Sequence, residues 1–64
     1  MKIPKQEEIV VTYIFEGIKS YVVTRSLLRQ YILYKIIGDD DYKKIKTADS
    51  PIEFDKIVEN DRSK

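Results

Sequence analysis

The sequence predicts a small α+β domain, in which an N-terminal β-hairpin is followed by a long apolar helix and one or two short helices. Two runs of β-branched and aromatic residues with a glycine between them favour the hairpin. A third apolar run that ends at a glycine, and a Ser-Pro-Ile-Glu segment near residue 50, favour helices. The length of 64 residues limits the chain to one domain, residues 1–64.

The hairpin is expected over residues 8–24, with Glu16-Gly17 as its turn. A two-residue connection that contains glycine, placed between two strand-like runs, is a hairpin signal. This turn would place Tyr13 opposite Ser20. Both faces of the hairpin would carry apolar side chains and both edges would be free, so the hairpin needs cover from the rest of the chain.

A long helix is expected over residues 25–37. Thr24 or Ser26 could cap its start, and Gly38 could adopt the left-handed conformation just past its end. At 100° per residue its apolar side chains fall almost all round the helical wheel. Such a helix needs burial on several sides, which favours a homodimer or a partner protein.

A short helix is expected at residues 41–47, although the sequence leaves open whether residues 39–49 form a helix or an irregular loop. A firmer helix signal follows, with Ser50 as the N-cap, a proline after it and Glu53 completing a capping box. This signal predicts a helix over residues 51–60.

The two ends of the chain are polar and are expected to be flexible, at residues 1–7 and 61–64.

The composition argues against enzymatic chemistry. The chain has no cysteine and no histidine, so thiol catalysis, a histidine-based triad and the usual structural zinc sites lack their residues. It has two glycines, too few for a phosphate-binding loop. The acidic run Asp39-Asp40-Asp41 lacks the alternating spacing of a calcium loop, and a solvated loop is the favoured interpretation. We expect no catalytic residue, metal, cofactor or small-molecule substrate.

A cytoplasmic location without a membrane partner is expected. No run approaches the roughly 18 apolar residues of a membrane span, and the N-terminal residues do not resemble a signal peptide. The formal net charge is +1, too small for a strong global field. The richness in Ile, Lys, Tyr and Asp is typical of AT-rich genomes, such as those of some bacteria and phages.

Protein binding is the leading functional prediction, because tyrosine is favoured at interfaces and the chain has five. The predicted contacts are Tyr21, Val22, Arg29 and Tyr34. The order of a hairpin followed by helices resembles that of small regulators and inhibitors encoded by phages and mobile elements. No motif carries this resemblance beyond architecture, size and composition.

Two alternatives remain open. A nucleic-acid-binding regulator would use a basic patch on the hairpin and the long helix, where positions 25 and 29 would share a helix face. That patch comprises Lys19, Arg25, Arg29 and Lys35. The second alternative is a minor structural or assembly protein of a particle. Binding that weakens steeply as salt rises would indicate nucleic acid rather than a mostly apolar protein interface.

Overall fold

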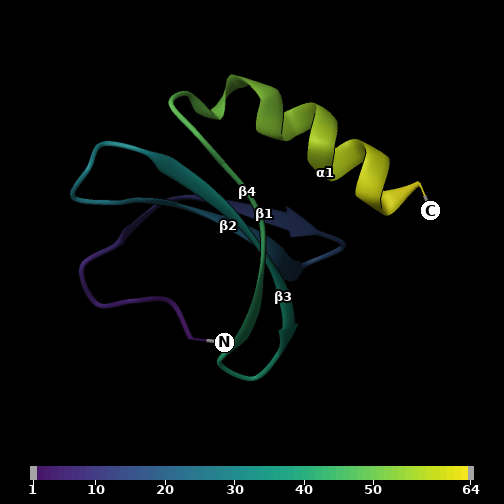
Figure 1. Cartoon of the computed structure of the whole chain (residues 1–64). Helices are drawn as coiled ribbons and strands as arrows, with labels where there is room; N and C mark the ends of the chain where they lie inside the picture. Colours follow the sequence, from purple (N-terminus) through teal and green to yellow (C-terminus); the bar gives the residue numbers. More distant parts are fainter. Residues whose placement is uncertain (1, 64) are drawn as a thin grey trace.

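The computed structural model describes residues 2–63, which form a four-stranded antiparallel sheet followed by one helix (Figure 1). The strands follow one another in space as they do in the sequence, in the order β1-β2-β3-β4. A short 3-10 turn, η1, continues into the helix α1. Their bounds are β1 (Glu8–Phe15), β2 (Ile18–Arg25), β3 (Tyr31–Gly38), β4 (Asp41–Ala48), η1 (Pro51–Glu53) and α1 (Phe54–Arg62).

The predicted hairpin and its turn are confirmed. Glu16 and Gly17 have φ angles of 55° and 79°, the left-handed conformation that a two-residue hairpin turn with matching twist requires at both positions. The predicted register of Tyr13 opposite Ser20 is wrong, because Tyr13 lies opposite Tyr21. An irregularity in the β1–β2 ladder next to Tyr13 shifts the pairing by one residue.

The predicted helix over 25–37 is wrong. Residues 26–30 form a loop, and the rest of the segment is the central strand β3. Apolar residues all round a helical wheel are also apolar residues on both faces of a strand, and β3 is covered on both faces. Thr24 belongs to β2 rather than to a helix cap, and Gly38 ends β3 without a positive φ.

The predicted short helix at 41–47 is also wrong, because these residues form β4, an edge strand paired with β3. The three aspartates that precede and begin β4 make the turn, with Asp40 at a φ of 55°. Tyr42 and Ile45 are half-buried against opposite sides of the sheet. The architecture is therefore a four-stranded meander and one helix, not a hairpin and a long apolar helix.

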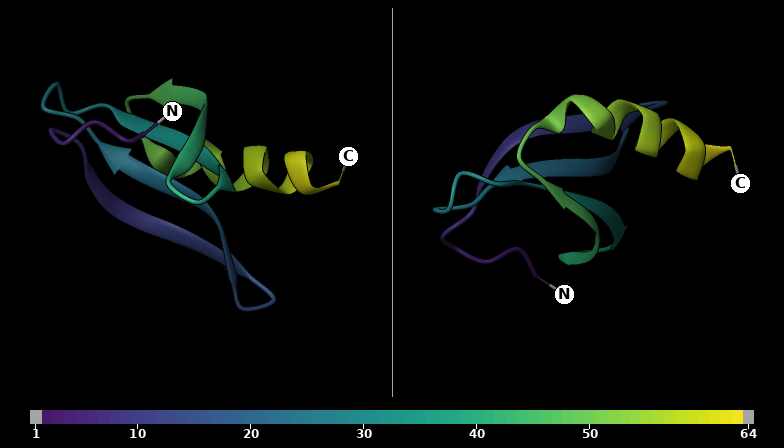
Figure 2. Two further views of the ribbon diagram at one scale, coloured as in Figure 1. Left: turned by 90° about the horizontal axis from the view of Figure 1, so that it is seen from below. Right: turned by 45° about the horizontal axis from the view of Figure 1, so that its top comes forward.

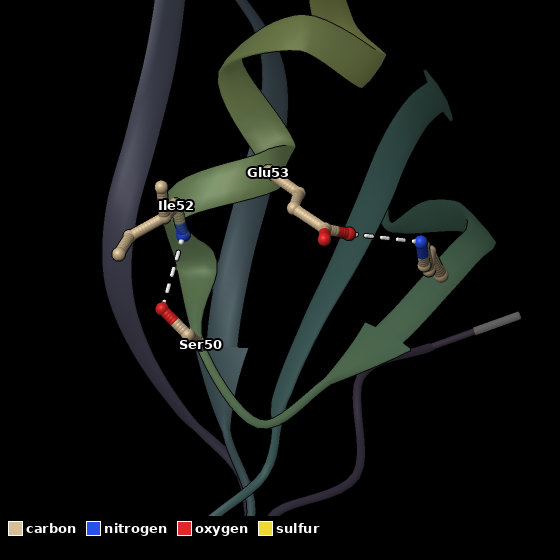
Figure 3. Close-up of polar contacts among 4 residues, drawn as sticks. Ser50, Ile52 and Glu53 are labelled. Carbon is tan, nitrogen blue, oxygen red and sulfur yellow. Dashed lines mark hydrogen bonds and ion pairs between the residues drawn. The ribbon is translucent and has the colours of Figure 1, made fainter.

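The predicted helix start at Ser50 is confirmed. The Ser50 hydroxyl accepts a hydrogen bond from the backbone N–H of Ile52 at 3.4 Å, and Pro51 follows the cap (Figure 3). Glu53 turns instead toward β4, where its carboxylate forms an ion pair with Lys46 at 3.1 Å. The helical segment ends at Arg62, slightly beyond the predicted range.

The sheet is the middle layer of the fold. Figure 2 shows α1 on one side of the sheet and the N-terminal segment on the other. The α1 side holds the larger apolar cluster, and the opposite side holds a smaller cluster against which Ile3 packs. The buried members are Tyr21, Val23, Leu33, Phe54 and Val58 on the α1 side, and Val22, Ile32 and Tyr34 on the other.

Candidate functional site

Three of the four predicted protein contacts lie inside the core. Tyr21, Val22 and Tyr34 are at most 4% exposed, so their rings and methyl groups are already covered by this chain. Arg29 is the member of this set that is exposed, in the loop between β2 and β3. Tyr21 and Val22 lie in a strand of the hairpin, as predicted, whereas the helix expected to carry Arg29 and Tyr34 does not exist, because those residues belong to a loop and to β3.

The four basic residues of the alternative prediction lie along the whole β2–β3 hairpin. Arg25 and Arg29 are at its loop end, while Lys19 and Lys35 are near the other end of the strands. Lys35 forms an ion pair with Asp61 at 3.1 Å. The structure therefore brings Arg25 and Arg29 to one end of the sheet, on a loop instead of a helix.

Polar contacts fasten α1 to the sheet. The Tyr13 hydroxyl donates a 2.6 Å hydrogen bond to Asp55 Oδ1, and the Tyr21 hydroxyl donates one to Asp61 Oδ2. The guanidinium of Arg62 lies 3.6 Å from the centroid of the Phe15 ring, a cation–π contact. These contacts join the carboxylates of Asp55 and Asp61 to the sheet and so hold the helix against it.

A single carboxylate fastens the N-terminal segment to the other face. Glu7 Oε1 accepts hydrogen bonds from the hydroxyls of Thr24 at 2.6 Å and Tyr34 at 2.7 Å. Both donors are 0% exposed, so the carboxylate satisfies two groups that water does not reach. Residues 4–7 also form a turn closed by the Glu7 N–H and the Pro4 carbonyl.

Alkaline pH is expected to destabilise the fold. Burial, and then a hydrogen bond to a neighbouring carboxylate, raise the pKa of Tyr13, Tyr21 and Tyr34 from 10.0 to about 12. The folded state thus favours the neutral phenols. Their stabilising contribution is complete below pH 10 and is lost as the pH rises toward about 12.

Thermal melting followed by circular dichroism across this pH window, together with tyrosinate absorbance, tests this expectation. The variant Tyr13→Phe removes one of the three groups and should reduce the alkaline loss of stability. Melting temperatures that stay constant up to pH 12 would contradict it.

The two edges of the sheet differ in character. Edge strand β4 carries Lys43, Lys44 and Lys46, the kind of charge that discourages pairing with another strand. Edge strand β1 has no charged side chain between residues 9 and 15. Its side chains are also unusually open for apolar residues, with exposures of 50% for Ile9, 43% for Val10, 40% for Val11 and 56% for Ile14.

We define the β1 edge as residues 9–15 together with their outer backbone groups. Because β1 is the first strand in the order, it pairs with β2 on one side and with no strand of the described chain on the other. In the left view of Figure 2, β1 lies along the outer side of the sheet. Unpaired backbone N–H and C=O groups along such a strand are a template for a further strand.

The sequence contained this signal, because the hairpin was expected to have free edges. Residue type alone does not indicate this edge, since Tyr21, Val22 and Tyr34 belong to the central strands β2 and β3. A strand that is uncharged over seven residues and first in a meander is the pattern that would have identified the β1 edge.

A second exposed apolar feature is the tip of the β2–β3 loop. Leu27 is 79% exposed and Leu28 is 82% exposed. The loop is closed by backbone hydrogen bonds from Ser26 N–H to the Gln30 carbonyl at 2.9 Å and from Arg29 N–H to the Ser26 carbonyl at 3.0 Å. Arg29 adopts a φ of 61° there, a conformation that favours glycine or asparagine.

The hollow beside the end of α1, about 380 Å³, is lined by Lys35, Asp61 and Arg62, whose charges already contact other groups. Within residues 2–63, no group of three or more acidic side chains is arranged to hold a metal ion.

Comparison with known proteins identifies no relative. No protein-family model, curated protein or solved structure matches the chain. Among residues 2–63, α1 is the one α-helix, and it is too short and too polar to cross a membrane.

Proposed function

We propose that this chain is a non-enzymatic protein-binding module that pairs its β1 edge with an extended segment of a partner protein. The observation that carries the proposal is the combination of free backbone groups and exposed apolar side chains on one edge strand that has no charged side chain between residues 9 and 15. Added strands obtain affinity from main-chain hydrogen bonds and specificity from alternate side chains, and β1 offers both.

The contrast with β4 supports this choice. Both strands are at the edges of the same sheet and both have eight residues, yet β4 carries three lysines and β1 has none. A chain that needed only to stay monomeric would gain from the same protection on both edges. The β1 edge lacks these charges, although its ladder with β2 has two irregularities, and it is therefore the better candidate for a partner.

The basic residues give weaker support for nucleic acid. A phosphate-binding surface needs several basic side chains on one face. Lys19 and Lys35 instead lie far along the strands from the two arginines at positions 25 and 29. Lys35 is also paired with Asp61. The homodimer was expected because a long apolar helix would need cover, and no such helix is present in the described chain. The oligomeric state stays a prediction.

The variant Ile14→Lys is expected to lower partner binding at least about tenfold, because a lysine within a pairing edge opposes strand addition. Its effect on the free energy of unfolding should stay within about 1 kcal/mol, since Ile14 is already more than half exposed. The measurement is affinity capture from nuclease-treated lysate with tagged wild type and variants, followed by mass spectrometry.

The matched control is Ile52→Lys, because Ile52 is 83% exposed and belongs to η1 rather than to β1. The supporting result is a protein retained by wild type and by Ile52→Lys but lost with Ile14→Lys. Equal capture by all three proteins would argue against the β1 edge. Capture that disappears with nuclease would favour the nucleic-acid alternative.

A further inference from the structure

We propose that the segment that pairs with the β1 edge is an apolar strand with a basic residue at each end. This inference rests on the proposed function, because it specifies the partner of the same edge. It follows from the charges that bracket the edge. Glu8 begins β1 and Glu16 follows its last residue, with no charged side chain between them.

The two carboxylates lie at opposite ends of the pairing surface. At about 3.3 Å per residue, the eight positions from Glu8 to Glu16 span roughly 26 Å of extended chain. Both side chains are exposed, and Glu16 is held by the turn with its φ of 55°. A partner strand about nine residues long would bring its own ends next to these carboxylates, where opposite charges across strands are favourable. On the inner side of β1, Glu8 is already opposite Arg25 of β2, so a basic residue of the partner would join an existing pair there, whereas Glu16 has no such neighbour in the register.

Self-pairing of β1 meets the opposite situation. An antiparallel pair of β1 strands centred on Thr12 places Glu8 of each copy opposite Glu16 of the other. Like charges directly opposite one another on neighbouring strands are destabilising. The arrangement of charges therefore favours a different protein segment over a second copy of β1.

Pairing of the β1 edge with β4 of a second copy is also a poor match. The lysines of β4 lie at positions 43, 44 and 46, in the interior of the strand. They would face the uncharged centre of β1 rather than its acidic ends. The β1 edge complements a partner strand that has basic residues at its ends and apolar residues in its centre.

Two labelled nine-residue peptides test this inference. One alternates valine and threonine between terminal lysines, and its twin carries terminal glutamates. Both have blocked ends. Fluorescence anisotropy at low ionic strength should show the lysine peptide binding about fivefold or more tightly than the twin, because two exposed ion pairs each contribute modestly. The difference should shrink at high salt.

Charge reversal on the protein provides the matching half of the test. The double variant Glu8→Lys/Glu16→Lys should prefer the glutamate peptide, while Glu59→Lys on the exposed surface of α1 should leave the preference unchanged. Circular dichroism checks that the variants fold. The single variant Glu8→Lys, expected to reduce the preference by about half, replaces the double variant if the latter does not fold.

The outcomes separate this inference from the proposed function. If wild type binds the two peptides equally and Ile14→Lys abolishes this binding, the charge selection is overturned and edge pairing is left intact. Binding of neither peptide would overturn both. Light scattering of wild type and of Ile14→Lys tests whether a second copy occupies the edge. A wild-type dimer that Ile14→Lys dissociates would place a second copy on the β1 edge and overturn the inference.

Discussion

The variant Phe54→Ala is expected to lower the free energy of unfolding by about 3–5 kcal/mol, the usual cost of truncating a fully buried phenylalanine. Phe54 is 0% exposed and is the first residue of α1. It belongs to the cluster that joins α1 to the sheet, together with Leu33 and Val58. A domain of this size has roughly 3–10 kcal/mol of stability in total, so this variant should be mostly unfolded or have a much lower melting temperature.

Urea unfolding followed by circular dichroism measures this effect. Ile52→Ala is the matched control, because Ile52 lies two residues earlier and is 83% exposed, and its change should stay within about 0.5 kcal/mol. Phe54→Leu keeps a large apolar side chain and gives a measurable intermediate value if the alanine variant does not fold. Similar stabilities for Phe54→Ala and Ile52→Ala would contradict the packing of α1 against the sheet.

The variant Glu7→Ala is expected to cost about 2–4 kcal/mol of unfolding free energy. Its carboxylate is the acceptor for the buried hydroxyls of Thr24 and Tyr34, and loss of the carboxylate leaves both without that acceptor. An unsatisfied buried hydroxyl costs about 1–3 kcal/mol. The N-terminal segment would also lose its anchor on the sheet, which uncovers the smaller apolar cluster.

The neighbouring Glu8→Ala is the control for charge and position. Glu8 is exposed at the start of β1, so its replacement should change the stability by about 0.5 kcal/mol or less. Glu7→Gln keeps an acceptor oxygen without the charge and should fall between the two variants. Equal stability of Glu7→Ala and Glu8→Ala would show that the Glu7 contacts do not stabilise the fold.

Local signals predicted the parts of the fold that local chemistry determines. The turn at Glu16-Gly17 and the helix start at Ser50 depend on a few adjacent residues, and both are confirmed. Residues 31–37 could not be assigned in this way, because an uninterrupted apolar run fits a buried helix and a central strand equally well. The decision for β3 depends on its pairing with β2 and β4, which are contacts outside the run itself.

Enrichment in β-branched residues and tyrosine from Tyr31 to Ile37 was the available hint of a strand. The helix interpretation gained weight from Thr24 and Gly38, whose positions fit helix ends. In the folded chain the Thr24 hydroxyl instead donates a hydrogen bond to Glu7 Oε1, a partner 17 residues away. Capping residues alone do not identify a helix when their side chains have an alternative partner.

The candidate site was the harder prediction. Prediction by residue type favours Tyr21, Val22 and Tyr34 as interface residues, and the same properties make them good core residues. Which strand lies at the edge follows from the order of the sheet, and the order depends on the identity of the third and fourth elements. With 25–37 taken as a helix, the contrast between β1 and β4 could not be recognised.

The meander order also has a consequence for the folding pathway. Each strand pairs with the strand next to it in the sequence, so the sheet can assemble through short loop closures, which are fast. The closing of α1 over the sheet is different, since Tyr13 must meet Asp55 across 42 residues and Tyr21 must meet Asp61 across 40. The hairpins are therefore expected to form early, and the arrival of α1 is the late event that converts a loose sheet into a cooperative domain.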